Sequence, residues 1–370
     1  MPQDNARTSM EALSALGQSV WLDYLSRDLL QSGKLAHLID RGLRGLTSNP
    51  TIFEHAIAKG EHYDDVLSAA QPADDDRAVF ETIAIADVQG AADLFRPVYD
   101  ATAGTDGFVS LEVSPTLARD TAGTLAEARR LWQTVDRPNL MIKVPGTREG
   151  WPAIEQLLTD GVNVNITLLF AVDHYKKVAE AYQRALEARL DAGKPIDRIA
   201  SVASFFVSRV DTEVDKRIDA KGGTLREFRG KAAIANAQVA YEWLLTYRND
   251  PRWRRLAERG ARVQRLLWAS TSTKDPSYSD LLYVEALIGP DTVDTMPPAT
   301  LEAFTDHGTA RRALSDDAGD ARRILGGLAK GGIDLDDVTR VLEDEGIDKF
   351  AASFRSLLET IGKKRGALTR

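Results

Sequence analysis

Eight short runs of β-branched and apolar residues recur along the chain, separated by longer stretches whose apolar residues repeat with helical spacing. Strands that alternate with helices are typical of βαβ units and predict a parallel sheet. Eight such units indicate an α/β protein with a closed (β/α)8 TIM barrel. The expected strands are Val20–Tyr24, Leu43–Ser48, Phe108–Val113, Leu140–Val144, Val162–Thr167, Ile199–Phe205, Arg265–Thr271 and Thr292–Met296.

The intervening segments carry helix signals. One apolar stripe runs through Ile154, Leu157 and Leu158 and ends at the Asp160-Gly161 stop. The acidic run Asp74–Asp76 is interpreted as the charged start of a helix that extends toward Ala101, because acidic side chains favour a helix N-terminus. A metal site is the weaker interpretation of that run. A second apolar stripe is formed by Tyr175, Val178, Ala179 and Tyr182.

Two stretches, 211–262 and 298–370, are too long for ordinary connections between a strand and a helix of the barrel, and both are expected to be helical. Within 211–262, helices are expected around Leu225–Tyr247 and Pro251–Arg259. Near the end of 298–370, the basic run Lys363–Arg365 is expected to be a solvated helix end. The predicted organisation is an N-terminal segment 1–19, a barrel domain 20–297 with a helical insertion at about 211–262, and a C-terminal helical extension 298–370 that packs on the barrel.

Composition narrows the possible partners. The 370-residue chain is 43% hydrophobic and 28% charged, with a formal net charge of −8. This charge argues against nucleic acid and anionic membranes, which reward clustered Lys and Arg. The chain has no cysteine, so disulfide and thiolate chemistry are excluded. Its start lacks a basic and then apolar leader, and no apolar run approaches the roughly 20 residues of a membrane span. A cytoplasmic location is therefore expected.

Polar residues occupy one face of the expected strands. In Val162–Thr167 the valines and Ile166 alternate with asparagines and a threonine, and alternate residues of a strand point to opposite faces. The apolar face is expected to pack on the outer helices, so the polar side chains point into the barrel and toward its C-terminal mouth. A hydrogen-bonded network that serves packing alone is the alternative. These inward residues are Asp23, Thr47, Asn49, Glu112, Lys143, Asn165 and Thr167.

Lys143 interrupts the apolar run Leu140–Pro145. Lysine is almost never buried without a reason, and desolvation lowers the pKa of its amine. A neutral amine attacks carbonyl groups and forms a Schiff base. The alternative is a lysine at the strand end that extends to solvent. The convergent carboxyl groups favour the catalytic interpretation, because perturbed charge systems of this kind occur at acid/base sites.

Several motifs occur in the order of one known family. The segment Gly45–Phe53 resembles the Thr-Asn-Pro signature of transaldolases, and Ile142–Thr147 followed by Asn163–Phe170 is similar to the Schiff-base region of that family. The strands that carry Asp23 and Glu112 extend the resemblance over most of 20–296. It implies a (β/α)8 transferase of the pentose phosphate pathway, which moves a dihydroxyacetone unit from a ketose phosphate to an aldose phosphate without a cofactor.

The resemblance also implies roles for individual residues. Lys143 forms the Schiff base, and Asp23 exchanges a proton with the substrate hydroxyl at the cleaved bond. Glu112, with Thr167, holds the water that transfers protons during imine formation. Asn49 and Asn165 contact substrate hydroxyls, and Thr47 supports them.

A phosphate-binding end is expected from Ser204 and Arg209, which match the phosphate-binding strand end of the family. An ordinary ion pair at Arg209 and a satisfied hydroxyl at Ser204 are the alternatives. Many members have a second arginine where this chain has Ser272, so Ser270 and Lys274 are expected to complete the site.

Two rival functions use the same barrel. An aldolase would release free dihydroxyacetone, but the related fructose 6-phosphate aldolases carry glutamine at the position of Glu112 and are shorter. A catalytically silent sugar-phosphate sensor is expected to lose Lys143 or Asp23. The scattered histidines make a metal site unexpected. The sequence leaves open whether the protein is a monomer or a homodimer. The histidines are His37, His55, His62, His174 and His307.

Overall fold

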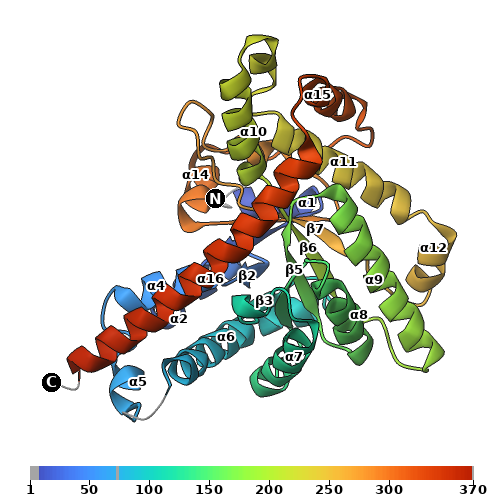
Figure 1. Cartoon of the computed structure of the whole chain (residues 1–370). Helices are drawn as coiled ribbons and strands as arrows, with labels where there is room; N and C mark the ends of the chain where they lie inside the picture. The colour runs from blue at the N-terminus through green and yellow to red at the C-terminus, as the bar shows by residue number, and fades with distance from the viewer. Residues whose placement is uncertain (1–7, 72–74, 369–370) are drawn as a thin grey trace, which may run out of the picture.

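A computed structural model describes residues 8–71 and 75–368 of the chain. Its eight parallel strands close into a barrel in chain order, with helices between successive strands (Figure 1). The predicted fold class is confirmed. The strands are β1 Gln18–Asp23, β2 Gly45–Thr47, β3 Phe108–Glu112, β4 Leu140–Pro145, β5 Val164–Leu169, β6 Ser201–Phe206, β7 Arg265–Ala269 and β8 Thr292–Met296.

The helices surround the barrel and extend beyond it (Figure 1). They are α1 Ser9–Ala15, α2 Arg27–Gln31, α3 Lys34–Asp40, α4 Pro50–Ala58, α5 Asp64–Ala69, α6 Asp76–Ala101, α7 Thr121–Val135, α8 Gly150–Asp160, α9 Val172–Asp191, α10 Ser208–Lys221, α11 Ala232–Tyr247, α12 Pro251–Ala257, α13 Leu282–Ala286, α14 Pro298–His307, α15 Gly319–Lys330 and α16 Leu335–Leu368. Two 3-10 turns, η1 Pro115–Leu117 and η2 Gly223–Phe228, join them.

Local sequence explains where several helices begin and end. Helix α8 ends at Gly161, whose φ of 104° lies in the left-handed region that favours glycine. The Asp75 side chain caps α6 by accepting a hydrogen bond from the Arg77 amide. This agrees with the acidic helix start expected there, although Asp74 lies outside the described residues.

Two details of the expected helices are wrong. A single helix around Leu225–Tyr247 is not found: α10 already starts at Ser208, and the η2 turn separates it from α11. Gly222 and Gly223 both have positive φ, which breaks the helical path between α10 and η2. The end of α16 is also less solvated than expected, because Lys364 pairs with Asp64 and Arg365 pairs with Asp76.

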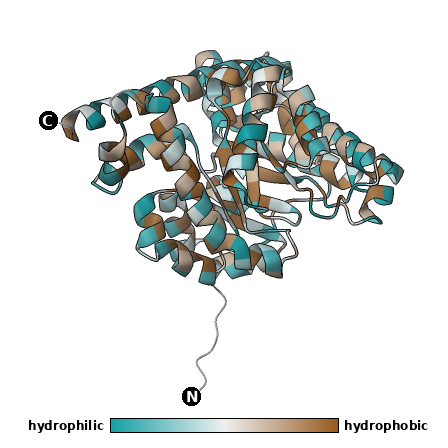
Figure 2. Cartoon of the chain, turned by 90° about the horizontal axis from the view of Figure 1, so that it is seen from below, coloured by the Kyte–Doolittle hydropathy of each residue, from teal (hydrophilic) through white to brown (hydrophobic). Residues whose placement is uncertain are grey.

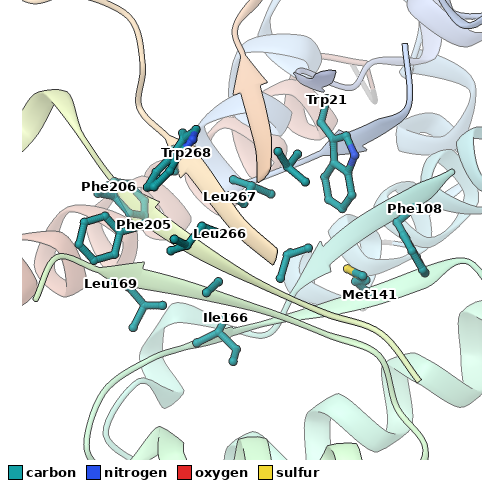
Figure 3. Packing of buried hydrophobic residues seen from close by; sticks show 14 of the residues in the cluster. Trp21, Phe108, Met141, Ile166, Leu169, Phe205, Phe206, Leu266, Leu267 and Trp268 are labelled. Atoms are coloured by element: carbon teal, nitrogen blue, oxygen red, sulfur yellow. The ribbon is translucent and has the colours of Figure 1, made fainter. Parts of the chain in front are cut away.

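The barrel has two apolar layers. Outward residues such as Leu266 and Trp268 pack beneath the helices, whereas Trp21, Phe108 and Met141 fill the lower interior (Figure 3). Gly45 makes room for the indole of Trp21, since a Cβ there would lie 2.5 Å from the ring. The outer helices show mixed hydrophilic and hydrophobic bands (Figure 2), as expected for helices with one buried face.

Helix α16 runs across the barrel (Figure 1). It contacts α4, α5 and α6 toward its C-terminal end, and it also contacts β5 and α10. The ring of Phe354 packs edge-on against Phe80 of α6, with centroids 5.8 Å apart. Asp337, near the start of α16, pairs with Arg217 of α10 at 2.8 Å. The last helix therefore connects elements from opposite sides of the barrel mouth.

Candidate active site

The C-terminal ends of the strands bring the predicted polar residues into neighbouring positions. Asp23 lies beside Thr47 in the register of β1 and β2. Lys143 lies between Glu112 of β3 and Asn165 of β5. Because parallel strands share one direction, residues at these ends meet at the same mouth of the barrel. The alternation rule therefore places the candidate residues correctly relative to one another.

A cavity of about 170 Å³ opens at this mouth. Its wall includes every predicted site residue except Glu112 and Asn165. Those in the wall are Asp23, Thr47, Asn49, Lys143, Thr167, Ser204, Arg209, Ser270 and Lys274.

Lys143 is buried, with 6% of its surface exposed. Its Nζ donates a hydrogen bond to the backbone carbonyl of Ser48 at 3.2 Å. Among the described residues it forms no ion pair within 4 Å, although Glu112 is its register neighbour. A lysine amine that points into a polar cavity without a paired carboxylate is placed to react with a carbonyl compound.

Glu112 is largely buried beside this lysine. Burial raises the pKa of its carboxyl to about 7; the charge of Lys143 opposes the rise and that of Asp23 adds to it. Its Oε2 has no hydrogen-bond partner among the described residues. A carboxyl with a pKa near neutrality gives and takes protons readily at physiological pH. Glu112 lies in a smaller adjoining space that it shares with Asn49.

Asp23 is oriented by hydroxyl groups. Thr47 Oγ1 donates a hydrogen bond to Asp23 Oδ1 at 2.8 Å and also lies 2.9 Å from Thr295 Oγ1. Asn49 caps α4, where its Oδ1 accepts a hydrogen bond from the Ile52 amide at 3.0 Å. This cap uses the side-chain oxygen and leaves the amide NH2 as the donor that Asn49 offers to the cavity.

Asn165 supports the cavity from below. Its Nδ2 donates to Ser110 Oγ at 3.0 Å, and its Oδ1 accepts from Ser204 Oγ at 2.7 Å. Thr167 is fully buried, and its Oγ1 has no partner among the described residues. The next residue, Leu168, has a positive φ of 60°, and the β5–β6 register shifts between Ile166 and Leu169. This irregularity lies directly after Thr167.

The opposite end of the cavity is cationic. The Arg209 guanidinium lies 5.2 Å from the ring centroid of Phe206 and, among the described residues, has no hydrogen bond or ion pair. Burial lowers the pKa of Arg209, and the charge of Glu345 opposes this shift. Burial and the charge of Arg209 lower the pKa of Lys274, whose Nζ donates to Ser272 Oγ at 2.7 Å. An arginine and a lysine that line one cavity together with the hydroxyls of Ser270 and Ser272 suit an anion such as phosphate.

Several cavity residues were missed by the sequence reasoning. Thr295 carries a usable signal, because alternation in Thr292–Met296 places it on the inner face with Val293. No sequence signal places Phe350 at the cavity, because it comes from α16, more than 50 residues after the last strand. The complete set of additional wall residues is Phe206, Ala269, Ser272, Thr295, Pro297 and Phe350.

Within the described part of the chain, no group of three or more His, Asp and Glu side chains is arranged to hold a metal ion. None of the described helices combines the length and apolar character that a membrane span requires.

Comparison with known proteins identifies the family. The model of the Transaldolase/Fructose-6-phosphate aldolase family matches residues 20–361. The chain belongs to this family. A transaldolase of Parafrankia sp. (strain EAN1pec) is 52% identical over 361 residues, which cover 96% of this chain and 97% of that protein. A transaldolase of Thermobifida fusca is 50% identical over 366 residues, which cover 97% and 99%.

A further relative extends the agreement. The transaldolase of Acidothermus cellulolyticus is 52% identical over 353 residues, which cover 94% of this chain and 95% of that protein. The match to the transaldolase/fructose-6-phosphate aldolase family reaches beyond the barrel into α16, since it ends at Ile361. The predicted resemblance is confirmed, and it includes the helix that supplies Phe350 to the cavity.

Proposed function

We propose that this protein is a transaldolase that works through a Schiff base on Lys143. The donor is a ketose phosphate, such as sedoheptulose 7-phosphate or fructose 6-phosphate. The acceptor is an aldose phosphate, such as glyceraldehyde 3-phosphate or erythrose 4-phosphate. The observation that carries the proposal is the buried Lys143 amine, which pairs with no carboxylate of the described residues and lies in a cavity with a cationic far end.

In the first half-reaction the Lys143 nitrogen attacks the C2 carbonyl of the donor and forms a carbinolamine. Loss of water then gives an iminium ion. Glu112, whose pKa is raised to about 7 by burial, transfers the protons of these steps through a water held with Thr167. The unpartnered Glu112 Oε2 and Thr167 Oγ1 support this role, because both atoms retain hydrogen-bonding capacity.

Cleavage follows from the iminium ion. Asp23 takes the proton of the C4 hydroxyl while the C3–C4 bond breaks. The electron pair of that bond moves toward the iminium nitrogen. An aldose phosphate leaves, and the three-carbon unit remains on Lys143 as an enamine. The acceptor aldehyde then reverses these steps, and Asp23 returns the proton. The hydrogen bond from Thr47 supports Asp23 as the base, because it fixes the carboxylate orientation.

The remaining residues bind the substrate. Arg209, Lys274, Ser270 and Ser272 form the phosphate end, and the Asn49 amide donates to substrate hydroxyls. Asn165 acts through Ser204, because its Oδ1 accepts the hydrogen bond from Ser204 Oγ and its Nδ2 donates to Ser110 Oγ inside the barrel.

A coupled assay tests the proposal. The purified protein is given fructose 6-phosphate and erythrose 4-phosphate, and sedoheptulose 7-phosphate, glyceraldehyde 3-phosphate and free dihydroxyacetone are all measured. Transfer without free dihydroxyacetone is the expected result. Stoichiometric release of dihydroxyacetone would show an aldolase, and binding without turnover would show a sensor.

A further inference from the structure

A buried carboxyl lies behind the phosphate end of the cavity and has no role in the proposed chemistry. Asp294 is in β8, where its neighbour Thr295 points into the cavity, so Asp294 faces the outer layer of the barrel. Neither Asp294 nor Thr271 has exposed surface. Thr271 Oγ1 donates a hydrogen bond to Asp294 Oδ1 at 2.9 Å, and Asp294 Oδ2 has no partner among the described residues.

Thr271 lies in the segment after β7, between two residues of the cavity wall. It separates Ser270 and Ser272, which both line the cavity. Ser270 has a positive φ of 58°, a backbone conformation that is disfavoured for a serine and needs support from its surroundings. Support on one side comes from Ser208, whose backbone N–H donates to the Ser270 carbonyl at 3.1 Å and whose Oγ lies 3.0 Å from Ser270 Oγ.

Support on the other side comes from Asp294. Through Thr271 it ties the segment that follows β7 to the neighbouring strand β8. Burial raises the pKa of Asp294 to about 7, so the carboxyl bears a proton over most of the acidic and neutral range. A protonated carboxyl still accepts the Thr271 hydrogen bond and places less negative charge behind an anion site.

We propose that Asp294 is a positioning residue, which acts through Thr271 to hold Ser270, Ser272 and Lys274 in the arrangement that binds the substrate phosphate. This inference rests on the proposed function, because it concerns the phosphate end of the same cavity. Binding groups that are held in place before the ligand arrives lose less conformational freedom on binding. Asp294 therefore affects phosphate affinity without touching the substrate.

The test compares Thr271→Val with Thr271→Ser, because valine keeps the shape of threonine and removes the hydroxyl. Thr271→Val is expected to raise the KM for fructose 6-phosphate by about three- to tenfold, the effect of one lost hydrogen bond. The kcat of Thr271→Val and its KM for unphosphorylated fructose should stay near those of the unmodified protein. Thr271→Ser keeps the hydroxyl and should keep the normal KM for fructose 6-phosphate. A lowered melting temperature with unchanged KM in Thr271→Val would overturn the inference.

Variants of Asp294 test the other half of the contact. Asp294→Asn keeps an acceptor for Thr271 and is expected to keep the normal KM for fructose 6-phosphate. The Asp294→Ala variant should raise that KM as Thr271→Val does. The double variant Thr271→Val/Asp294→Ala should have a KM for fructose 6-phosphate no higher than that of either single variant. Additive effects would contradict a shared contact. If Asp294→Ala does not fold, the comparison of Thr271→Val with Thr271→Ser, together with Asp294→Asn, still tests the inference.

These outcomes are separate from failure of the proposed function. An unmodified protein without transfer activity or borohydride-trapped adduct would overturn the function itself. Normal transfer by the unmodified protein, with unchanged KM in Thr271→Val, would overturn only the role of Asp294.

Discussion

At the scale of single residues, the proposed mechanism assigns the proton transfers to two carboxyl groups in different environments, Glu112 and Asp23. Glu112 is held by burial at a pKa of about 7, next to Lys143 in the strand register. Asp23 is held by a hydrogen bond from the hydroxyl of Thr47. Because the proposed mechanism uses the two carboxyl groups at different steps, we expect their variants to accumulate different intermediates.

Reduction with borohydride in the presence of fructose 6-phosphate separates these steps by the mass of the adduct. Asp23→Ala should retain an intact six-carbon phosphorylated adduct, because imine formation proceeds and C–C cleavage does not. The unmodified protein should carry mainly the three-carbon adduct. A three-carbon adduct formed at the normal rate in Asp23→Ala would rule out Asp23 as the base.

The pH dependence of imine formation tests Glu112. Loss of water from the carbinolamine needs the protonated carboxyl, whose fraction falls as pH rises through its pKa of about 7. The contribution of Glu112 to the single-turnover rate should therefore be present at pH 6 and largely lost at pH 8. Glu112→Gln should remove this pH dependence and slow adduct formation by about 100-fold at pH 6. The same pH dependence in Glu112→Gln would assign it to another group.

The predictability of the site also differs between residues. Strand alternation is a local rule, and from the sequence alone it predicts the inward positions of Asp23, Thr47, Lys143 and Thr167, which line the cavity. Thr271 shows its limit. A hydroxyl in a loop acquires meaning only from its contact with Asp294, 23 residues later in the chain, and no local pattern encodes that contact.

At the scale of elements, α16 connects the outer part of the molecule with the catalytic strands. Its Gly346 lies against the irregular end of β5, where a Cβ would be 2.9 Å from Leu168 Cδ2 and 4.0 Å from an Arg209 guanidinium nitrogen. Glycine is needed here for close approach, since its φ is not positive. The predicted ends of the strands lie within two residues of the ends in the structure. The path of α16 could not be predicted in this way, because it depends on tertiary contacts that apolar periodicity does not specify.

Replacement of Gly346 tests this contact. Gly346→Val should displace Leu168 and α16, lower the free energy of unfolding by roughly 1–3 kcal/mol and raise the KM for fructose 6-phosphate. Gly366→Val is the matched control in the same helix, because a Cβ there meets no atom of the described residues within 4 Å. Denaturant unfolding and steady-state kinetics measure both effects. Equal behaviour of the two variants would show that close packing at Gly346 has no importance for the site.

At the scale of the whole molecule, a formal net charge of −8 repels the anionic substrates. Attraction must come from the local cations at the cavity, Arg209 and Lys274. Composition alone predicted this need and argued against nucleic acid and anionic membranes as partners. It did not reveal that the charge of Glu345 in α16 acts on Arg209, because this depends on how two distant segments meet.

Removal of either cation tests the phosphate end. Arg209→Ala should raise the KM for phosphorylated substrates by an amount worth roughly 1.5–3 kcal/mol, the range for hydrogen bonds to charged groups. Lys274→Ala should have a smaller effect, because Lys274 as a residue is more exposed than Arg209. Both variants should lose selectivity over unphosphorylated fructose. An unchanged KM in Lys274→Ala would exclude Lys274 from phosphate binding.

The central claim is that Lys143 forms the covalent intermediate, and trapping that intermediate tests it most directly. The protein is reduced with borohydride during turnover of fructose 6-phosphate, digested and mapped by mass spectrometry. We expect one modified lysine, Lys143, with no adduct in Lys143→Ala and normal labelling in the control Lys363→Ala, which changes an exposed lysine outside the cavity wall. An adduct at another lysine, or continued transfer by Lys143→Ala, would contradict the account.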